Sequence, residues 1–205
     1  MKPIFWNKGK TYLSKNDKVL KLIIQEFNNE YLSINKNYYH CLLNSIIGQQ
    51  ISVAAASSIK KKFFSLKSNI NPISVLKLDK KKMKTSGLSS QKISYIINLS
   101  EFFLSNKKFV NNINFYRETV IKEKLINIKG IGPWTIDMFL IFSLGKSNIF
   151  PVGDLGLRKA ISKSYSNYNK VSERKLNLLY NKWTPYNTVA TWYLWRSIDP
   201  KPINY

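Results

Sequence analysis

The residues best suited to chemistry in this sequence lie between Leu125 and Arg158. The turn Lys129–Gly132, which reads KGIG, runs directly into an apolar segment that Pro133 can open as a helix. Glycines permit backbone angles that leave amide N–H groups pointing outward, and a helix N-terminus adds a positive dipole end. Both features favour a phosphate oxygen. The turn therefore predicts a grip on a nucleic-acid backbone, although an ordinary helix–helix turn uses the same residues.

A single carboxylate follows this turn further along the chain, at Asp154 behind the loop Phe150–Gly153. Asp154 precedes the helical pattern LGLRKA and so occupies the position of a helix N-cap. A cap would hold the carboxylate rigidly at an accessible loop–helix junction. Asp137 is the other acid nearby, but its place inside an apolar helix suits a buried or paired role. We therefore expect Asp154 to be the carboxylate available for catalysis.

The elements that must position these residues are predicted to be helices throughout. Apolar residues recur at three- and four-residue steps, and no run of alternating strands with hairpin turns is found, so we predict an all-α protein. The last helix is expected to have Thr184 as its N-cap and Pro185 at its first position. The segment Lys80–Lys82 is expected to be a charged turn, and Gly48 a break or a close-contact point. Helices are expected near 118–128, 133–144, 154–165 and 172–182, with another after Gly87.

The charge balance points to a polyanionic partner. The chain has 33 Lys and Arg residues against 11 Asp and Glu residues, a net charge of +22, and nucleic-acid phosphate is the usual partner for such a field. An AT-rich genome, which inflates the content of Lys, Asn, Ile and Tyr, is the alternative explanation. The lysine clusters at 60–62, 80–84 and 107–108 are expected to be solvated faces that add a non-specific electrostatic footprint.

The single cysteine and single histidine exclude several kinds of site. Cys41 alone cannot form an intramolecular disulfide, an iron–sulfur cluster or a Cys-rich zinc site. His40 alone argues against a histidine metal centre or a serine–histidine triad. The N-terminus does not resemble a signal peptide, and the longest apolar run, Met138–Leu144, is too short to span a bilayer. We therefore expect an intracellular protein, in the cytoplasm or nucleoid if the source is bacterial, that does not use a membrane.

Three segments resemble one family in the same order. The stretch Leu125–Arg158 resembles the helix–hairpin–helix and the Gly/Pro-rich loop with aspartate of the helix-hairpin-helix (HhH-GPD) DNA glycosylase superfamily. The segment Ile46–Ala55 is similar to the Gln-Gln-x-Ser segment of its 3-methyladenine DNA glycosylase II branch. The segment Trp183–Arg196 is similar to the C-terminal helix of the same branch. The likeness covers about residues 38 to 198.

The resemblance implies a fold and a division of the chain. It implies one glycosylase unit over residues 1–205, built as two helical lobes with the active-site cleft between them. One lobe would cover about 36–143, with the hairpin at 125–143. The N-terminal segment and about 145–205 would form the second lobe.

The resemblance also implies a reaction at Asp154. This residue matches the catalytic aspartate, whose charge stabilises the oxocarbenium-like sugar as the base leaves and helps to orient the attacking water. Trp134 stands where lyase-active members carry a nucleophilic lysine, and a tryptophan cannot form a Schiff base. The enzyme is therefore expected to remove a base without cutting the strand. Lys129 is expected to contact phosphate, and it remains a rival nucleophile.

The base pocket is expected to be aromatic. Trp134 and Trp195 match positions that wall the pocket in the alkylation branch, and Met138 replaces an aromatic found in some relatives. An indole face attracts a positively charged methylated purine through stacking and cation–π interactions. The alternative is that the tryptophans belong to the core, and for Trp183 and Trp192 we prefer that interpretation.

The expected DNA contacts come from two places. Gln49 and Gln50 match the loop that fills the gap left by a flipped nucleotide, with Gln50 as the wedge itself. The alternative is a buried amide that bridges two helix ends. The hairpin contacts are expected from Lys129, Gly130, Gly132 and Thr135.

The predicted function is a monofunctional, metal-independent DNA glycosylase that excises alkylated purines such as 3-methyladenine and 7-methylguanine. Its partner would be double-stranded DNA with alkylated bases, and the protein would act as a monomer. No catalytic cofactor or iron–sulfur cluster is expected, although the family hairpin often holds a structural potassium or sodium ion. Gly153, where some relatives have a second acid, and Asn187, in place of a frequent arginine, depart from the pattern. The alternatives are a non-catalytic helix-hairpin-helix DNA-binding module and a bifunctional glycosylase/AP lyase.

Overall fold

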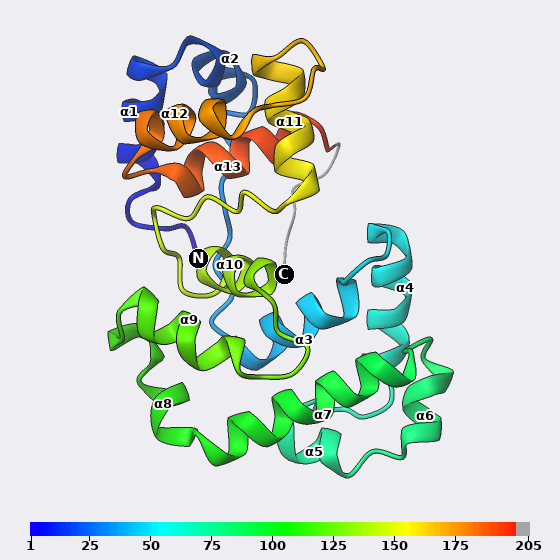
Figure 1. The fold of residues 1–205 in the computed structure, drawn as a ribbon. Coiled ribbons are helices and arrows are strands. Elements are labelled where there is room, and N and C mark those ends of the chain that lie inside the picture. Colours follow the sequence, from blue (N-terminus) through cyan, green and yellow to red (C-terminus); the bar gives the residue numbers. More distant parts are fainter. Residues whose placement is uncertain (200–205) are drawn as a thin grey trace. The chain divides into compact units, whose positions relative to one another are not determined.

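The structure, a computed structural model, describes residues 1–199. Every regular element in this range is a helix and none is a strand, which confirms the all-α prediction (Figure 1). The chain divides into two compact units. Of the described residues, the terminal unit combines Met1–Lys36 with Leu140–Asp199, and the central unit is Asn37–Phe139. The divisions expected from the sequence lie near residues 36 and 143.

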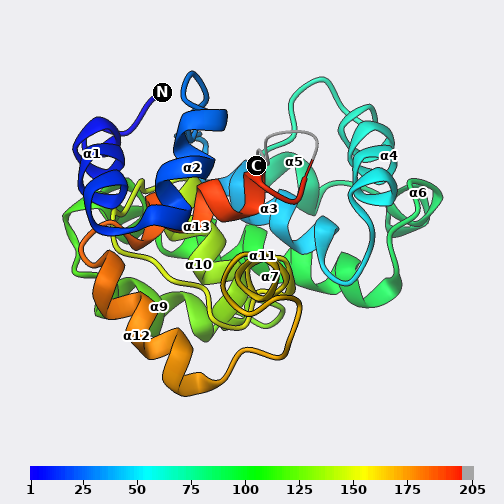
Figure 2. The ribbon, with the colours of Figure 1, turned by 90° about the horizontal axis from the view of Figure 1, so that it is seen from above.

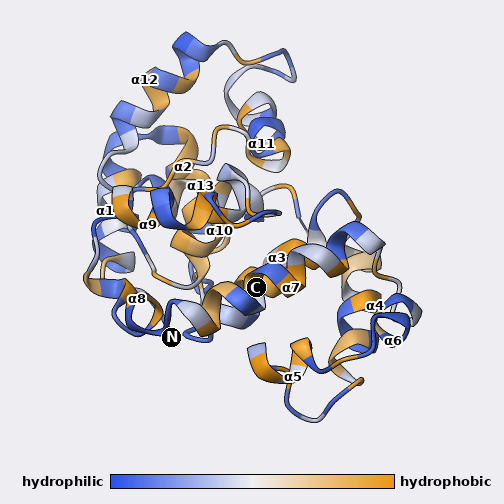
Figure 3. Ribbon diagram, turned by 60° about the horizontal axis from the view of Figure 1, so that its bottom comes forward, coloured by the Kyte–Doolittle hydropathy of each residue, from blue (hydrophilic) through white to orange (hydrophobic). Residues whose placement is uncertain are grey.

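The terminal unit brings the two ends of the sequence together. The first two helices pack against the last two, so that segments far apart in sequence lie side by side (Figures 1 and 2). Its helices are α1 (Trp6–Asn16), α2 (Lys18–Glu26), α11 (Leu155–Tyr165), α12 (Glu173–Trp183) and α13 (Asn187–Arg196). Helix α13 is buried from Asn187 to Trp195, although its colours in Figure 3 are mixed, because threonine, tyrosine and tryptophan lie near the middle of that hydropathy scale.

The central unit is organised around its longest helix, α7 (Ser90–Ser105), which packs against α3 and α5. The other elements of this unit are α3 (Tyr38–Gly48), α4 (Val53–Phe64), α5 (Pro72–Leu76), α6 (Lys80–Thr85), α8 (Lys107–Asn111), η1 (Ile113–Phe115) and α9 (Glu118–Ile126). Helix α10 (Pro133–Phe142) begins in the central unit and ends in the terminal unit.

Short polar side chains determine where many of the helices begin. An oxygen of such a residue accepts a backbone N–H that the first turn would otherwise leave without a partner. Asp154 does this for α11, as its sequence position predicted. The other side-chain caps are Asp17, Asn37, Ser52, Asn71, Asp79, Ser89 and Ser172.

Two predictions of local structure were wrong. Thr184 does not begin the last helix: its hydroxyl donates to the Tyr180 carbonyl and it ends α12, while Tyr186 is the N-cap of α13. The backbone N–H of Tyr186 donates to the Trp183 carbonyl, which holds the Thr184–Pro185 segment as a turn between the two helices. The segment that begins at Lys80 is a short helix and not a turn, because Asp79 caps it.

The buried side chains bear out the expected role of two tryptophans. Trp183 and Trp192 are 0% and 2% exposed, so both belong to the core of the terminal unit. Cys41 is buried as well. Among the helices of residues 1–199, none combines the length and the apolar character needed to cross a bilayer.

Candidate functional site

Asp154 is held by the loop before it and the helix after it. The Asp154 N–H donates to the Pro151 carbonyl at 2.9 Å, which closes the loop into a turn. Its Oδ1 accepts the Leu157 N–H at 2.6 Å, the capping bond of α11. Arg158 donates to the Val152 carbonyl at 2.5 Å and thereby ties the helix back to the loop. These hydrogen bonds hold the carboxylate in place. Because Asp154 is only half-buried, the carboxylate still reaches solvent.

A second donor reaches the same carboxylate oxygen. The indole Nε1 of Trp195 donates to Asp154 Oδ1 at 2.8 Å. Trp195 is 4% exposed, and its ring stacks on Phe142 with an interplanar angle of 12° and a centroid distance of 6.0 Å. The structure therefore brings two of the predicted site residues together. Stacking of Trp195 on a base stays a prediction.

The other two predicted pocket residues lie on α10. Trp134 is in its first turn and half-buried, whereas Met138 is 1% exposed and belongs to the packed interior. Asp137, the alternative carboxylate, is on the same helix. Burial raises the pKa of Asp137, partly opposed by Lys122, whose Nζ lies 3.8 Å from its Oδ1. Asp137 is therefore a largely buried, paired acid, as its place inside an apolar helix predicted.

The hairpin depends on one of its two glycines more than on the other. Gly130 has a φ of +99°, and a Cβ there would lie 2.1 Å from Cγ of Tyr95, so only glycine fits. Gly132 does not have a positive φ, so of the two glycines only Gly130 uses the backbone angles that glycine permits. Its carbonyl accepts the Ile136 N–H at 3.1 Å, which makes Gly132 the N-cap of α10. Nothing lies within 4 Å of a Cβ built at Gly132, so this side of the helix start is open. Lys129 is exposed beside it.

Gln49 joins the end of α3 to the hairpin. Its Nε2 donates to the Gly130 carbonyl and to Thr135 Oγ1, both at 3.0 Å. Gln49 is thus an amide that bridges two segments, the alternative to a direct DNA contact. Thr135 is 1% exposed, so its side chain bonds within the protein and does not face solvent. Contacts of Gln49 and Thr135 with DNA stay predictions.

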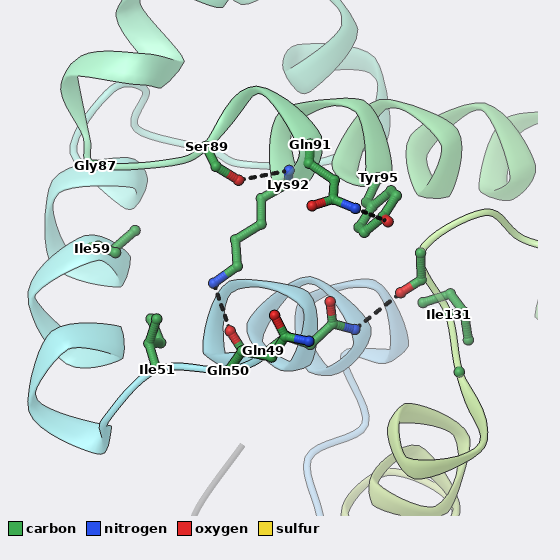
Figure 4. A pocket seen from close by; sticks show the side chains of 12 residues that line it. Gln49, Gln50, Ile51, Ile59, Gly87, Ser89, Gln91, Lys92, Tyr95 and Ile131 are labelled. Atoms are coloured by element: carbon green, nitrogen blue, oxygen red, sulfur yellow. Dashed lines mark hydrogen bonds between the residues drawn. The ribbon is translucent and has the colours of Figure 1, made fainter.

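Gln50 differs from Gln49 in being exposed and in having a left-handed backbone, with a φ of +57°. The loop that carries it is held by Lys92 of α7. Lys92 Nζ donates to the Gln49 carbonyl at 2.9 Å (Figure 4). It also donates to the Ile47 carbonyl at 2.7 Å. Burial lowers the pKa of Lys92. The ammonium thus satisfies carbonyls at the C-terminal end of α3, where a positive charge also complements the helix dipole.

A groove of about 560 Å³ lies within the central unit, between this loop, α7 and the hairpin (Figure 4). Its polar lining includes Gln50, Ser89, Gln91 and Lys92, and Gly130–Gly132 form its hairpin wall. The groove places the exposed Gln50 and the hairpin glycines on one surface of the central unit.

Sequence reasoning missed two residues that hold these sites. Lys92 reads as one more lysine on an amphipathic helix, and no local signal indicates that its ammonium reaches the end of α3. Gly156, inside the first turn of α11, lies against both Asp154 and Trp195. A glycine two residues after a cap is the one signal that could have drawn attention to it, since glycine weakens a helix.

The two sites offer different chemistry. The hairpin and the Gln50 loop offer backbone N–H groups, a helix N-terminus and an exposed amide, which suit phosphates and base edges. Asp154 offers a fixed negative charge that can stabilise a developing cation. No group of three or more His, Cys, Asp or Glu side chains comes together within residues 1–199.

Comparison with known proteins identifies relatives of this chain. Residues 43–185 match the family model described as HhH-GPD superfamily base excision DNA repair protein. A Bacillus subtilis protein is 29% identical over 188 residues, which cover 88% of this chain and 66% of that protein's length.

Solved structures show the same similarity. A Schizosaccharomyces pombe 3-methyladenine DNA glycosylase in complex with abasic DNA is similar with a TM-score of 0.82 and 25% identity. The match covers 93% of this chain and 96% of that one. A Bacillus halodurans DNA-3-methyladenine glycosidase gives a TM-score of 0.74 and 31% identity, over 92% of this chain and 87% of that one.

Proposed function

Because the chain belongs to the HhH-GPD superfamily of base excision DNA repair proteins, we propose that it is a monofunctional DNA glycosylase that removes alkylated purines from duplex DNA. The names of the two similar solved proteins support the 3-methyladenine branch. The observation that carries the proposal is Asp154, a half-buried carboxylate held by the Leu157 N–H and the Trp195 indole on one oxygen. A DNA-binding module without activity does not need a carboxylate fixed in this way.

The proposed reaction is hydrolysis of the N-glycosidic bond. As the bond between the sugar C1′ and the base nitrogen breaks, positive charge develops on the sugar, and the Asp154 carboxylate stabilises it. Water then bonds to C1′ and loses a proton. A methylated purine such as 3-methyladenine or 7-methylguanine already carries positive charge and leaves readily. One carboxylate without a partnering histidine is therefore sufficient chemistry.

Trp134 supports base removal without strand cleavage. A lyase needs an amine that attacks C1′ and forms a Schiff base, and the indole of Trp134 has none. Lys129, exposed at the hairpin, is the rival amine for a lyase mechanism.

The proposed DNA contacts come from the central unit. The open side of Gly132 and the N-terminus of α10 would receive a phosphate, and the exposed Gln50 would fill the space left by the flipped nucleotide. We expect the protein to act as a monomer on double-stranded DNA. Its place of action would then be intracellular, with the DNA.

A potassium or sodium ion at the hairpin is also part of the proposal. The peptide carbonyls of residues 126–131 are the oxygen ligands that such an ion takes. Several of these carbonyls already have partners within the protein, since Gly130 accepts from Gln49, Ile128 from the Ile131 N–H and Lys129 from the Asn98 amide. An ion here would bridge the hairpin to a phosphate and take no part in bond breaking.

The proposal is tested by asking which free base the protein releases. Duplexes that contain 7-methylguanine, 3-methyladenine, hypoxanthine or 8-oxoguanine are incubated with the protein, and the released bases are separated and measured. We expect release of the methylated purines, with an abasic strand that stays intact until alkali is added. Release of none of these bases would contradict the glycosylase assignment. A covalent adduct trapped by borohydride would instead support a lyase.

A further inference from the structure

Within the terminal unit, the Trp195 indole is hydrogen-bonded to the Asp154 carboxylate. The indole N–H has a single donor direction, and it is aimed at Asp154 Oδ1 over 2.8 Å. The stacking of Trp195 on Phe142, together with its 4% exposure, fixes the ring that carries this donor. A hydrogen bond from a fixed donor restricts rotation of the carboxylate.

Gly156 makes room for this contact. It lies in the first turn of α11, and a Cβ at this position would be 3.1 Å from Asp154 Oδ1. The same Cβ would be 3.5 Å from Cδ1 and 3.6 Å from Nε1 of Trp195. A side chain here would therefore press on the Asp154 carboxylate while lying in ordinary contact with the Trp195 ring. Gly153, on the other side of Asp154, has nothing within 4 Å of its Cβ position.

We propose that Trp195 and Gly156 are positioning residues for the Asp154 carboxylate, and that Trp195 acts on the reaction through its indole N–H. This inference rests on the proposed function and adds two residues to it. Trp195 donates the hydrogen bond that sets the direction of the carboxylate. Gly156 leaves the space in which the carboxylate and the indole meet.

The chain contains a matched control for the tryptophan. Trp183 is also a buried indole that donates its Nε1–H to a capping aspartate, Asp17, at 3.0 Å, and Asp17 is only 1% exposed. Trp195→Phe and Trp183→Phe each remove one indole N–H and keep an aromatic ring. Any general cost of losing such a bond to an aspartate is thus common to both variants.

The two variants are compared by steady-state excision of 7-methylguanine and by thermal unfolding. We expect Trp195→Phe to lower kcat by about 10- to 100-fold with KM nearly unchanged, as for loss of a hydrogen bond to a charged group. Trp183→Phe is expected to lower Tm and to leave kcat unchanged below its unfolding transition. A wild-type kcat in Trp195→Phe would overturn the proposal. A raised KM with unchanged kcat would also overturn it, and would assign Trp195 to the base pocket.

The glycine is tested without removing any donor. Gly156→Ala is expected to lower kcat by about 3- to 30-fold, since displacing a catalytic group by a fraction of an ångström costs part of the 100-fold effect of a 1 Å misplacement. Its Tm should be unchanged or raised, because alanine favours a helix. Gly153→Ala is the control, and it should keep the wild-type kcat. Equal kcat values for the two alanine variants would contradict the role of Gly156.

A direct observation of the hydrogen bond separates this inference from the proposed function. The indole ¹H–¹⁵N signal of Trp195 is assigned by its absence in Trp195→Phe. We expect it to move upfield in Asp154→Ala, whereas the Trp183 signal stays in place. An unmoved Trp195 signal would overturn the inference even if the protein is an active glycosylase. A protein that releases no base would instead refute the proposed function, whatever this signal does.

Discussion

Two aspartates of the terminal unit are built on the same local plan and differ in one respect. Asp17 caps α2 and accepts the indole N–H of Trp183, while Asp154 caps α11 and accepts the indole N–H of Trp195. Asp17, however, is 1% exposed, whereas Asp154 is half-buried at a loop. The difference in access is what separates a structural carboxylate from one that can meet a substrate.

The partners of Asp17 explain how a carboxylate can be buried so completely. Besides its two capping bonds and Trp183, it accepts the Tyr165 hydroxyl and the Lys182 ammonium, each at 3.0 Å. Burial opposes ionisation of Asp17, but the hydrogen bonds from Trp183, Lys182 and the Leu20 N–H outweigh it and lower its pKa. Burial and the neighbouring Asp17 charge in turn raise the pKa of Tyr165. A carboxylate that is buried with these partners has a structural role and does not reach a substrate.

The largest expected effect is that of replacing Asp154, the more accessible aspartate of the pair. Asp154→Asn keeps the cap, since asparagine caps a helix as well as aspartate does. It removes the charge, so excision of 7-methylguanine should fall by on the order of 10³-fold while duplex binding stays within about twofold. Single-turnover kinetics and fluorescence anisotropy measure the two quantities. Wild-type excision by this variant would show that Asp154 is not the catalytic group.

The buried member should show the opposite pattern. Asp17→Asn removes a buried charge that accepts the Trp183 indole N–H and the Tyr165 hydroxyl and pairs with the solvent-exposed Lys182 ammonium, so it should lower the free energy of unfolding by about 1–3 kcal/mol. Below its unfolding transition, kcat should be unchanged. Urea denaturation measures the stability, and Asp79→Asn, at the exposed cap of α6, serves as the control with an expected change under about 0.5 kcal/mol. An equal loss in both variants would mean that burial adds nothing to the cap.

A part of the same effect should appear on acidification. Because the pKa of Asp17 is lower in the folded than in the unfolded protein, its contribution to stability is fully present above about pH 4. It is lost as the pH falls through the folded-state pKa. The difference in unfolding free energy between the wild type and Asp17→Asn should therefore shrink below about pH 4. A difference that stays constant down to pH 2 would contradict the lowered pKa.

The smallest effect extends the comparison to the hairpin, which uses no carboxylate. Gly132→Ala places a methyl group in open space, so Tm should be unchanged, but the methyl group would meet an approaching phosphate. We expect duplex affinity to fall by about three- to tenfold with kcat preserved at saturation. Gly130→Ala is the contrasting variant and should lower Tm, because its Cβ would collide with Tyr95. Unchanged DNA affinity in Gly132→Ala would argue against a phosphate at this site.

Much of the fold could be predicted because it depends on local patterns. Apolar periodicity predicted α9, α10, α11 and α12 to within about two residues, and the cap position of Asp154 followed from its place before LGLRKA. The start of α13 could not be predicted in this way. Thr184 and Pro185 have the residue types of a helix start. However, the Thr184 hydroxyl donates to the Tyr180 carbonyl in the last turn of α12, and α13 begins only at Asn187.

What the sequence determined by itself is the set of chemical groups and the family to which they belong. The KGIG turn, the Gln-Gln loop, the isolated Asp154 and the tryptophan in place of a lysine can all be read from residue types and spacing. Only the tertiary structure decided which of the two helix-capping aspartates is accessible to solvent. It also decided which tryptophan donates a hydrogen bond to each of them. It likewise decided that the Gln49 side chain bonds to the hairpin and that Lys92 supports the Gln50 loop. The absence of a side chain at Gly156 leaves space for the contact between Asp154 and Trp195. These contacts join residues about 40 or more positions apart, or depend on how much solvent a packed helix excludes. Short-range sequence patterns indicate neither the long-range contacts nor the solvent exclusion.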